Sequence, residues 1–105
     1  MLHETDTMAP PPRFLFAHTR KALAYRPGIT SIVLYGLEVG DGLEGPYYLE
    51  IRFLDYETLR SEGDHLMFSL EEAMEAAEAD YGILPGDWRE MDEAEVARIH
   101  VGQAG

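Results

Sequence analysis

The fold of this chain is decided by Phe68-Ser69-Leu70-Glu71-Glu72-Ala73-Met74, which carries the start signal of a helix. The Ser69 hydroxyl is placed to accept a hydrogen bond from the backbone N–H of Glu72, and the Glu72 carboxylate to accept one from Ser69. Such a capping box satisfies donors that a helix start otherwise leaves unpaired. Negative charge at Glu71 and Glu72 also suits the positive end of the helix dipole. The stretch therefore predicts a helix that begins at Leu70.

The predicted helix runs from Leu70 to about Tyr81. Apolar side chains recur at helical spacing and predict a buried stripe of Leu70, Ala73, Met74, Ala77 and Tyr81. Gly82 suits the helix end, because a glycine adopts the left-handed conformation at little cost. The outer side carries acids without any Lys or Arg on the helix to pair with them, namely Glu71, Glu75 and Glu78. This outer face is therefore expected to be uniformly negative.

Strands are expected before this helix. The segment 29–39 is rich in β-branched and aromatic residues and apolar on both faces, which predicts a central strand. A loop over 40–46, with three glycines and a proline, joins it to a strand over 47–54, so that the two form an antiparallel hairpin. We expect 55–64 to be a polar connection and 65–68 to be a third short strand that leads into the helix.

The strand over 47–54 alternates between two kinds of side chain. One face is apolar and consists of Tyr47, Leu49, Ile51 and Phe53. The other face is expected to point toward water or a partner and consists of Tyr48, Glu50 and Arg52. The buried stripe of the helix is expected to pack on the Tyr47 face or on the opposite side of the strand around Ile32–Tyr35.

The chain is expected to form one domain over 13–101, after a flexible, proline-containing leader over 1–12 and before a frayed tail over 102–105. The segment 13–26 has no acid and holds half of the eight basic side chains, namely Arg13, Arg20, Lys21 and Arg26. It is expected to begin as a strand near Phe14, with a helix as the alternative. Its charge either packs beside the acidic body or forms a second contact surface.

Two further capping patterns follow the helix, at Asp87–Glu90 and Asp92–Glu95. The first is expected to open a single helical turn, and Trp88 within it to pack on the core. The second predicts a short C-terminal helix, with an edge strand over 96–101 as the alternative. Together these elements predict an α+β fold: an antiparallel sheet of three to four strands, one main amphipathic helix on one face, and the short C-terminal helix.

Composition narrows the range of functions. The 105 residues suit one domain with a real core, since 46% of them are hydrophobic. The chain has no cysteine, which excludes disulfides and thiolate chemistry, and it shows no signal peptide or membrane-spanning run, so we expect a cytoplasmic protein. The net charge of −12 disfavours nucleic acids and anionic membranes as partners. It leaves a basic protein as a partner, or solubility alone as the role of the charge.

Residues that could carry catalysis are not grouped in the sequence. No two histidines are spaced as joint metal ligands on one helix face; they are His3, His18, His65 and His100. The Asp64-His65 pair could orient a base or a metal ligand, although a structural role at the end of a strand is favoured. There is no nucleophile elbow and no phosphate-binding glycine loop. We therefore expect no enzyme activity, no metal and no cofactor.

Four short motifs together suggest a relationship: Tyr48–Ile51, Phe68–Ala73, Asp80–Ile83 and Asp87–Arg89. They resemble small uncharacterised bacterial α+β proteins in which a β-meander leads into a Ser-Leu-Glu-Glu-Ala helix. Some of those proteins look like immunity proteins of polymorphic toxins, so the resemblance implies an inhibitory binding role. It implies no catalytic residue.

Two functions are therefore expected, and they differ in the surface they use. In the first, an acidic surface docks a basic partner through Glu71, Glu75, Glu78, Asp87, Glu90, Asp92 and Glu93. In the second, a sheet face or edge that includes Tyr48 and Arg52 meets a second copy of the chain in a homodimer.

Overall fold

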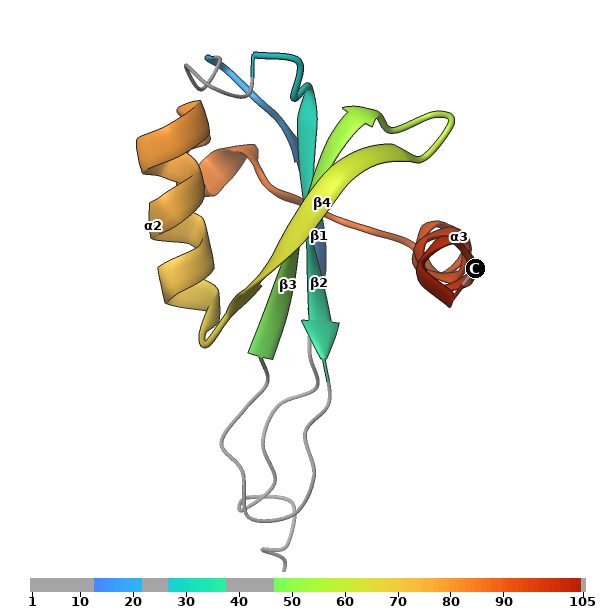
Figure 1. Ribbon diagram of the computed structural model, residues 1–105. Helices are drawn as coiled ribbons and strands as arrows, with labels where there is room; N and C mark the ends of the chain where they lie inside the picture. Colours follow the sequence, from blue (N-terminus) through green and yellow to red (C-terminus); the bar gives the residue numbers. More distant parts are fainter. Residues whose placement is uncertain (1–12, 22–26, 38–46, 105) are drawn as a thin grey trace, which may run out of the picture.

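The computed structural model describes residues 13–21, 27–37 and 47–104, and they form a five-stranded antiparallel sheet with a helix on each side (Figure 1). In chain order the elements are β1 (Phe14–His18), β2 (Ser31–Leu37), β3 (Tyr47–Asp55), β4 (Arg60–Met67), α2 (Leu70–Tyr81), the short 3-10 turn η1 (Pro85–Asp87), β5 (Arg89–Glu90) and α3 (Glu93–Ala104). The α+β class is thereby confirmed. The expected leader over 1–12 and loop over 40–46 lie outside the described residues.

The strands are arranged in the order β4-β3-β2-β1-β5, which puts β2 at the centre of the sheet as predicted. β2 and β3 pair antiparallel from Ser31 opposite Phe53 to Leu37 opposite Tyr47. The expected count of three to four strands is too low by β5, which pairs with β1. Two residues are too few to show a strand period, so this strand exists only through its pairing with β1.

The strand β4 is longer than the short strand expected over 65–68, and it includes half of the predicted polar connection. Its pairing with β3 shifts register between Ile51 and Asp55, and Gly63 has a φ of 124°. Such a bulge lets a polar, glycine-containing segment continue a strand that its composition argues against.

The helix α2 has the predicted ends. The Ser69 hydroxyl accepts a hydrogen bond from the backbone N–H of Glu72 at 3.0 Å. The return bond differs from the prediction, because the Glu72 carboxylate accepts from the N–H of Phe68 at 3.4 Å instead of from Ser69. At the other end Gly82 takes the left-handed conformation with a φ of 71°. The N-terminal segment is held there too, since the Tyr81 carbonyl accepts the backbone N–H groups of Arg20 and Lys21.

The sheet is covered on both faces, so the molecule has three layers (Figure 1). The small side chains of Ala73 and Ala77 bring α2 close to one face, over a core that includes Leu15, Ala17, Ile32, Leu34, Tyr48 and Met67. On the other face Ile99 of α3 and Met91 pack over Phe16, Val33, Ile51 and Phe53. Of the two expected packing faces for α2, the Tyr47 face is therefore wrong, because α3 packs there, and the alternative on the opposite side, over Ile32 and Leu34 of β2, is the one found.

The segment after α2 was predicted only in part. Trp88 packs against the core as expected, but Asp87 closes η1 by accepting the N–H of Leu84 and opens no turn of its own. The alternative of an edge strand over 96–101 is wrong, since α3 runs to Ala104 and includes most of the expected frayed tail. No helix in the described ranges is long and apolar enough to cross a membrane.

Candidate functional site

The helix α2 presents a negative outer face made of Glu71, Glu75 and Glu78. All three side chains are exposed, and they lie away from the buried Ala73 and Ala77 because of the helical spacing. Among the residues that the structure describes, none forms an ion pair with these three. Within the described residues, the charge of this face is therefore not neutralised.

Two other predicted docking residues, Asp87 and Glu90, are occupied within the fold. Arg20 holds Asp87 by two hydrogen bonds of 2.6 and 2.7 Å, and Arg13 holds Glu90 at 3.0 Å. The bonds from Arg20, together with the N–H of Leu84, lower the pKa of Asp87 to about 2. Arg13 and Arg20 of the basic N-terminal segment thus pair with the acidic body, the first of the two expected alternatives.

The prediction that Tyr48 and Arg52 face water or a partner is wrong for Tyr48, which is buried beneath α2, while the Arg52 side chain is 13% exposed and pairs within the fold. Tyr48 is 3% exposed, and its hydroxyl accepts the backbone N–H of Arg13 at 3.1 Å. Arg52 donates to the buried carboxylate of Glu50 at 3.4 Å. Burial raises the pKa of Glu50, and the charge of Arg52 opposes that rise. Tyr48 therefore cannot contribute to an external surface in this fold, and the Arg52 side chain is largely occupied by Glu50.

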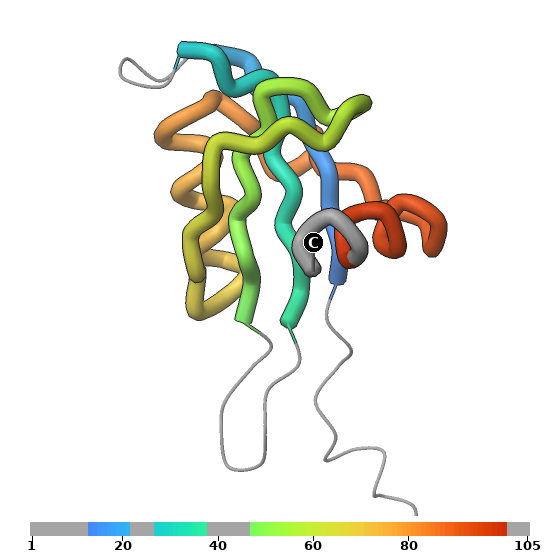
Figure 2. The backbone as a smooth tube through the Cα atoms, turned by 45° about the vertical axis from the view of Figure 1, so that its right-hand side comes forward, coloured from blue at the N-terminus to red at the C-terminus, as the bar shows by residue number. Residues whose placement is uncertain are grey.

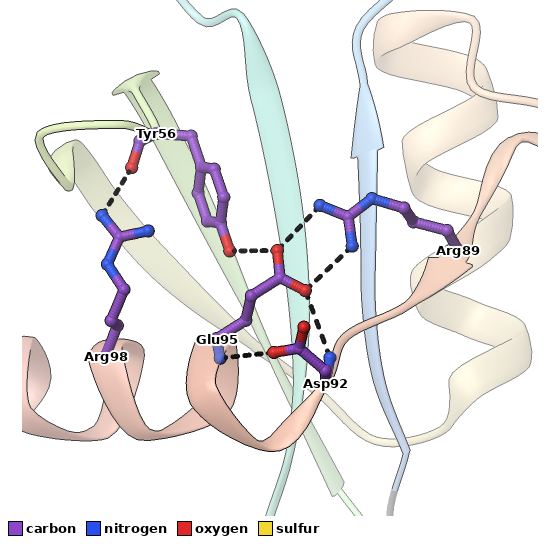
Figure 3. A network of polar contacts seen from close by, with 5 residues as sticks. All are labelled: Tyr56, Arg89, Asp92, Glu95 and Arg98. Atoms are coloured by element: carbon purple, nitrogen blue, oxygen red, sulfur yellow. Dashed lines mark hydrogen bonds and ion pairs between the residues drawn. The ribbon is translucent and has the colours of Figure 1, made fainter.

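A polar network that sequence reasoning missed is centred on Glu95 in the first turn of α3 (Figure 3). Its carboxylate accepts two hydrogen bonds from Arg89, at 2.8 and 2.9 Å, and one from the Tyr56 hydroxyl at 3.1 Å. Glu95 and Asp92 also exchange bonds as the predicted capping pair, at 2.8 and 3.1 Å. Arg98 lies over the Tyr56 ring, 5.5 Å from its centre. The network therefore ties α3 to β5 and to the end of β3.

The network fixes the protonation of its members. The hydrogen bonds from Arg89 are the main reason that the pKa of Glu95 falls to about 2. Burial, with the bond to Glu95, raises the pKa of Tyr56 to about 12. At neutral pH Glu95 is therefore charged and Tyr56 is a donor. The capping pattern pointed to Glu95, but nothing local in the sequence connects it to Arg89 or Tyr56.

Two shallow hollows lie beside α3. One, of about 440 Å³, is mostly apolar and is lined by Phe14, Tyr35, Met91, Glu93, Val96, Ala97 and His100. The Tyr35 hydroxyl and His100 Nδ1 are 3.2 Å apart at its wall. The other, of about 400 Å³, surrounds the Glu95 network and includes His18. Both exist because α3 packs across the sheet, a contact that no local motif predicts.

The remaining candidate, Asp64-His65, lies exposed on β4. His65 is opposite Glu50 in the β3–β4 pairing. In the described parts of the chain no three histidine or carboxylate side chains gather as a group that could hold a metal ion.

Comparison with known proteins assigns this chain no function. No family model, curated protein or solved structure matches this chain. The similarity to immunity-like proteins consequently stays a prediction from the sequence.

Proposed function

We propose that this protein is a cytoplasmic, acidic binding module that docks a basic protein through the outer face of α2, as an inhibitor or immunity-type protein would. The observation that carries the proposal is the uneven distribution of ion pairs. Arginines pair with Asp87, Glu90, Glu95 and Glu50, whereas Glu71, Glu75 and Glu78 have no such partner among the described residues.

The face is also well suited to recognition because its charges are held on a fixed element. The helix is capped at both ends and packed on the sheet through Ala73, Ala77 and Tyr81. Charges of one sign on a rigid surface steer an oppositely charged partner and speed its association, and salt weakens that effect.

The test compares two variants that each remove two negative charges. Glu75→Gln/Glu78→Gln changes the α2 face, and the control Glu57→Gln/Glu93→Gln changes exposed acids elsewhere. Partners captured from the host lysate by the unmodified protein are titrated with all three proteins at low and high salt. We expect the α2 variant to bind about tenfold more weakly at low salt, with the control near the unmodified protein. Equal affinity of the two variants would overturn the proposal.

The alternative function is self-association. Burial of Tyr48 argues against the interface first expected, but the outer strand β4, with its exposed Leu66 and the exposed Phe68 that follows it, favours another one. Light scattering over a range of protein concentrations measures this directly. A constant monomeric mass would exclude the homodimer.

A further inference from the structure

The strand β4 forms a long open edge of the sheet. It pairs with β3 on one side, and no described strand lies on its other side. All of its residues except Met67 are exposed. The opposite edge of the sheet is much shorter, since β5 has only two residues and α3 begins three residues after it. An open edge carries unpaired backbone N–H and C=O groups and is a template for another strand.

Large apolar side chains are exposed at one end of this edge. Leu66 is 39% and Phe68 62% exposed. Leu66 ends a row of side chains that crosses four strands, because Phe14 pairs with Tyr35, Tyr35 with Leu49, and Leu49 with Leu66. Figure 2 shows the coloured part of α3 beside β1, with β3 and β4 farther from it on the other side of β2. The row therefore packs against the core on the α3 side at Phe14, Tyr35 and Leu49, and ends in the exposed Leu66 at the edge of the sheet.

The two halves of β4 differ in how well they could accept a strand. The half before Asp64 contains the bulge, and Gly63 adopts a positive φ there. Bulges of this kind protect natural edges from pairing. From Asp64 to Met67 the pairing with β3 is regular, residue by residue. This regular half is the part that carries Leu66 and leads to Phe68.

The charge around the regular half is negative. Asp64 is exposed on the edge itself. Beyond Phe68 the chain enters α2, which packs against β3 and β4 (Figure 1), and the first two turns of this helix carry the exposed Glu71 and Glu75. Side chains of an added strand would alternate between the two faces of the sheet. Those on one face would extend the row that ends at Leu66, and those on the other would lie beside the acidic helix.

We propose that the partner docks by adding an extended strand to Asp64–Met67, and that this strand alternates apolar and Lys or Arg side chains. The inference rests on the proposed function and names the partner's chemistry. A second copy of the chain fits less well, because it would bring its own Asp64 and a net charge of −12 to the same edge. Main-chain hydrogen bonds supply the affinity in such strand addition, and alternate side chains supply the specificity.

The test uses synthetic peptides and the full chain. The first peptide alternates valine and lysine, is capped at both ends and is as long as β4. The second has the same sequence with all of its backbone amides N-methylated, so that its charge is unchanged but neither of its edges can donate hydrogen bonds to a strand. The third alternates valine and glutamate. We expect saturable binding of the first, at least about tenfold weaker binding of the second, and none of the third.

Protein variants locate the site. In Leu66→Ser/Phe68→Ser the exposed apolar pair is lost, and we expect about tenfold weaker binding of the valine–lysine peptide. Leu84→Ser is the matched control, since Leu84 is 45% exposed away from β4, and it should bind normally. Circular dichroism checks that both variants fold. If the double variant does not fold, the comparison of the first two peptides on the unmodified protein still shows whether binding depends on backbone pairing.

The outcomes separate this inference from the proposed function. Equal binding of the parent and N-methylated peptides would overturn strand addition, while the loss of affinity in Glu75→Gln/Glu78→Gln would still support docking by charge. Equal binding of the valine–glutamate peptide would overturn both. A dimeric mass that no peptide changes would assign the edge to a second copy and overturn the proposal.

Discussion

Replacing Glu95 with glutamine removes the charge at the centre of the network that holds α3 to the sheet. The side chain keeps its size, but one of its two oxygens becomes an NH₂ group that faces the guanidinium of Arg89. An arginine only donates hydrogen bonds, so this contact becomes a clash of donors. We therefore expect Glu95→Gln to lower the free energy of unfolding at neutral pH.

The pKa of Glu95 sets the size of the effect. It falls from 4.5 to about 2, mainly because of the hydrogen bonds from Arg89. At about 1.4 kcal/mol for each tenfold change in proton affinity, the fall corresponds to roughly 3 kcal/mol. The Arg89 side chain is 51% exposed, and solvent screening weakens such a pair. We expect a loss of about 1.5–2 kcal/mol at neutral pH.

The same shift predicts how the loss depends on pH. Because the pKa is lower in the folded state, the charge of Glu95 stabilises the fold fully above 4.5, and the stabilisation disappears as the pH falls toward about 2. The two proteins should therefore converge in acid. Urea unfolding can be followed by the fluorescence of Trp88, the single tryptophan, which packs against the core.

The control is Glu93→Gln, which removes an exposed charge from the same first turn of α3. Both variants lose the same interaction with the helix dipole, so the difference between them isolates the network. We expect Glu93→Gln to cost less than about 0.5 kcal/mol. An equal loss of unfolding free energy in both variants would refute the reasoning. So would a difference in unfolding free energy between Glu95→Gln and the unmodified protein that stays constant down to acid pH.

Three further changes test the fold by urea unfolding. Ser69→Ala removes the cap of α2 and should cost about 1 kcal/mol. Gly82→Ala should cost about 1 kcal/mol or more, because Gly82 has a φ of 71° and an added Cβ would lie 3.3 Å from Cβ of Arg20. Arg52→Met leaves Glu50 buried without its partner and should cost about 3 kcal/mol at neutral pH. Because burial raises the pKa of Glu50, the stability of that variant should recover as the pH falls, opposite in sign to the effect at Glu95.

The helix boundaries could be predicted from the sequence because their signals act over one turn. Ser69 and Gly82 bound α2 at the expected residues, and the Asp92–Glu95 pair marks the start of α3. The strand β5 could not be predicted, because the only strand that its two residues pair with among the described residues is β1, more than seventy positions earlier. The Glu95 network is missed for the same reason, since Tyr56 and Arg89 meet only after α3 has packed.

The assignment of faces on β3 shows where alternation misleads. Glu50 and Arg52 are polar and share a face, which is typical of a strand with one side in water. Here each is the other's partner, so the pair could be buried under α2 together with Tyr48. A pattern of polar residues cannot distinguish solvated side chains from paired ones. The central strand did indicate that both faces of the sheet are covered, because a strand that is apolar on both faces requires a layer on each side of the sheet.

The same reasoning decides which acids remain for a partner. Whether an acidic residue is available to a partner depends on whether a basic residue of its own chain pairs with it. The basic N-terminal segment is distant in sequence from the acids that it neutralises. Arg13 and Arg20 take Glu90 and Asp87 out of the predicted surface. Asp92 accepts the backbone N–H of Glu95 as the cap of α3. What remains exposed and without an ion pair among the described residues is the outer face of α2 together with Glu93, a smaller surface than the sequence indicated.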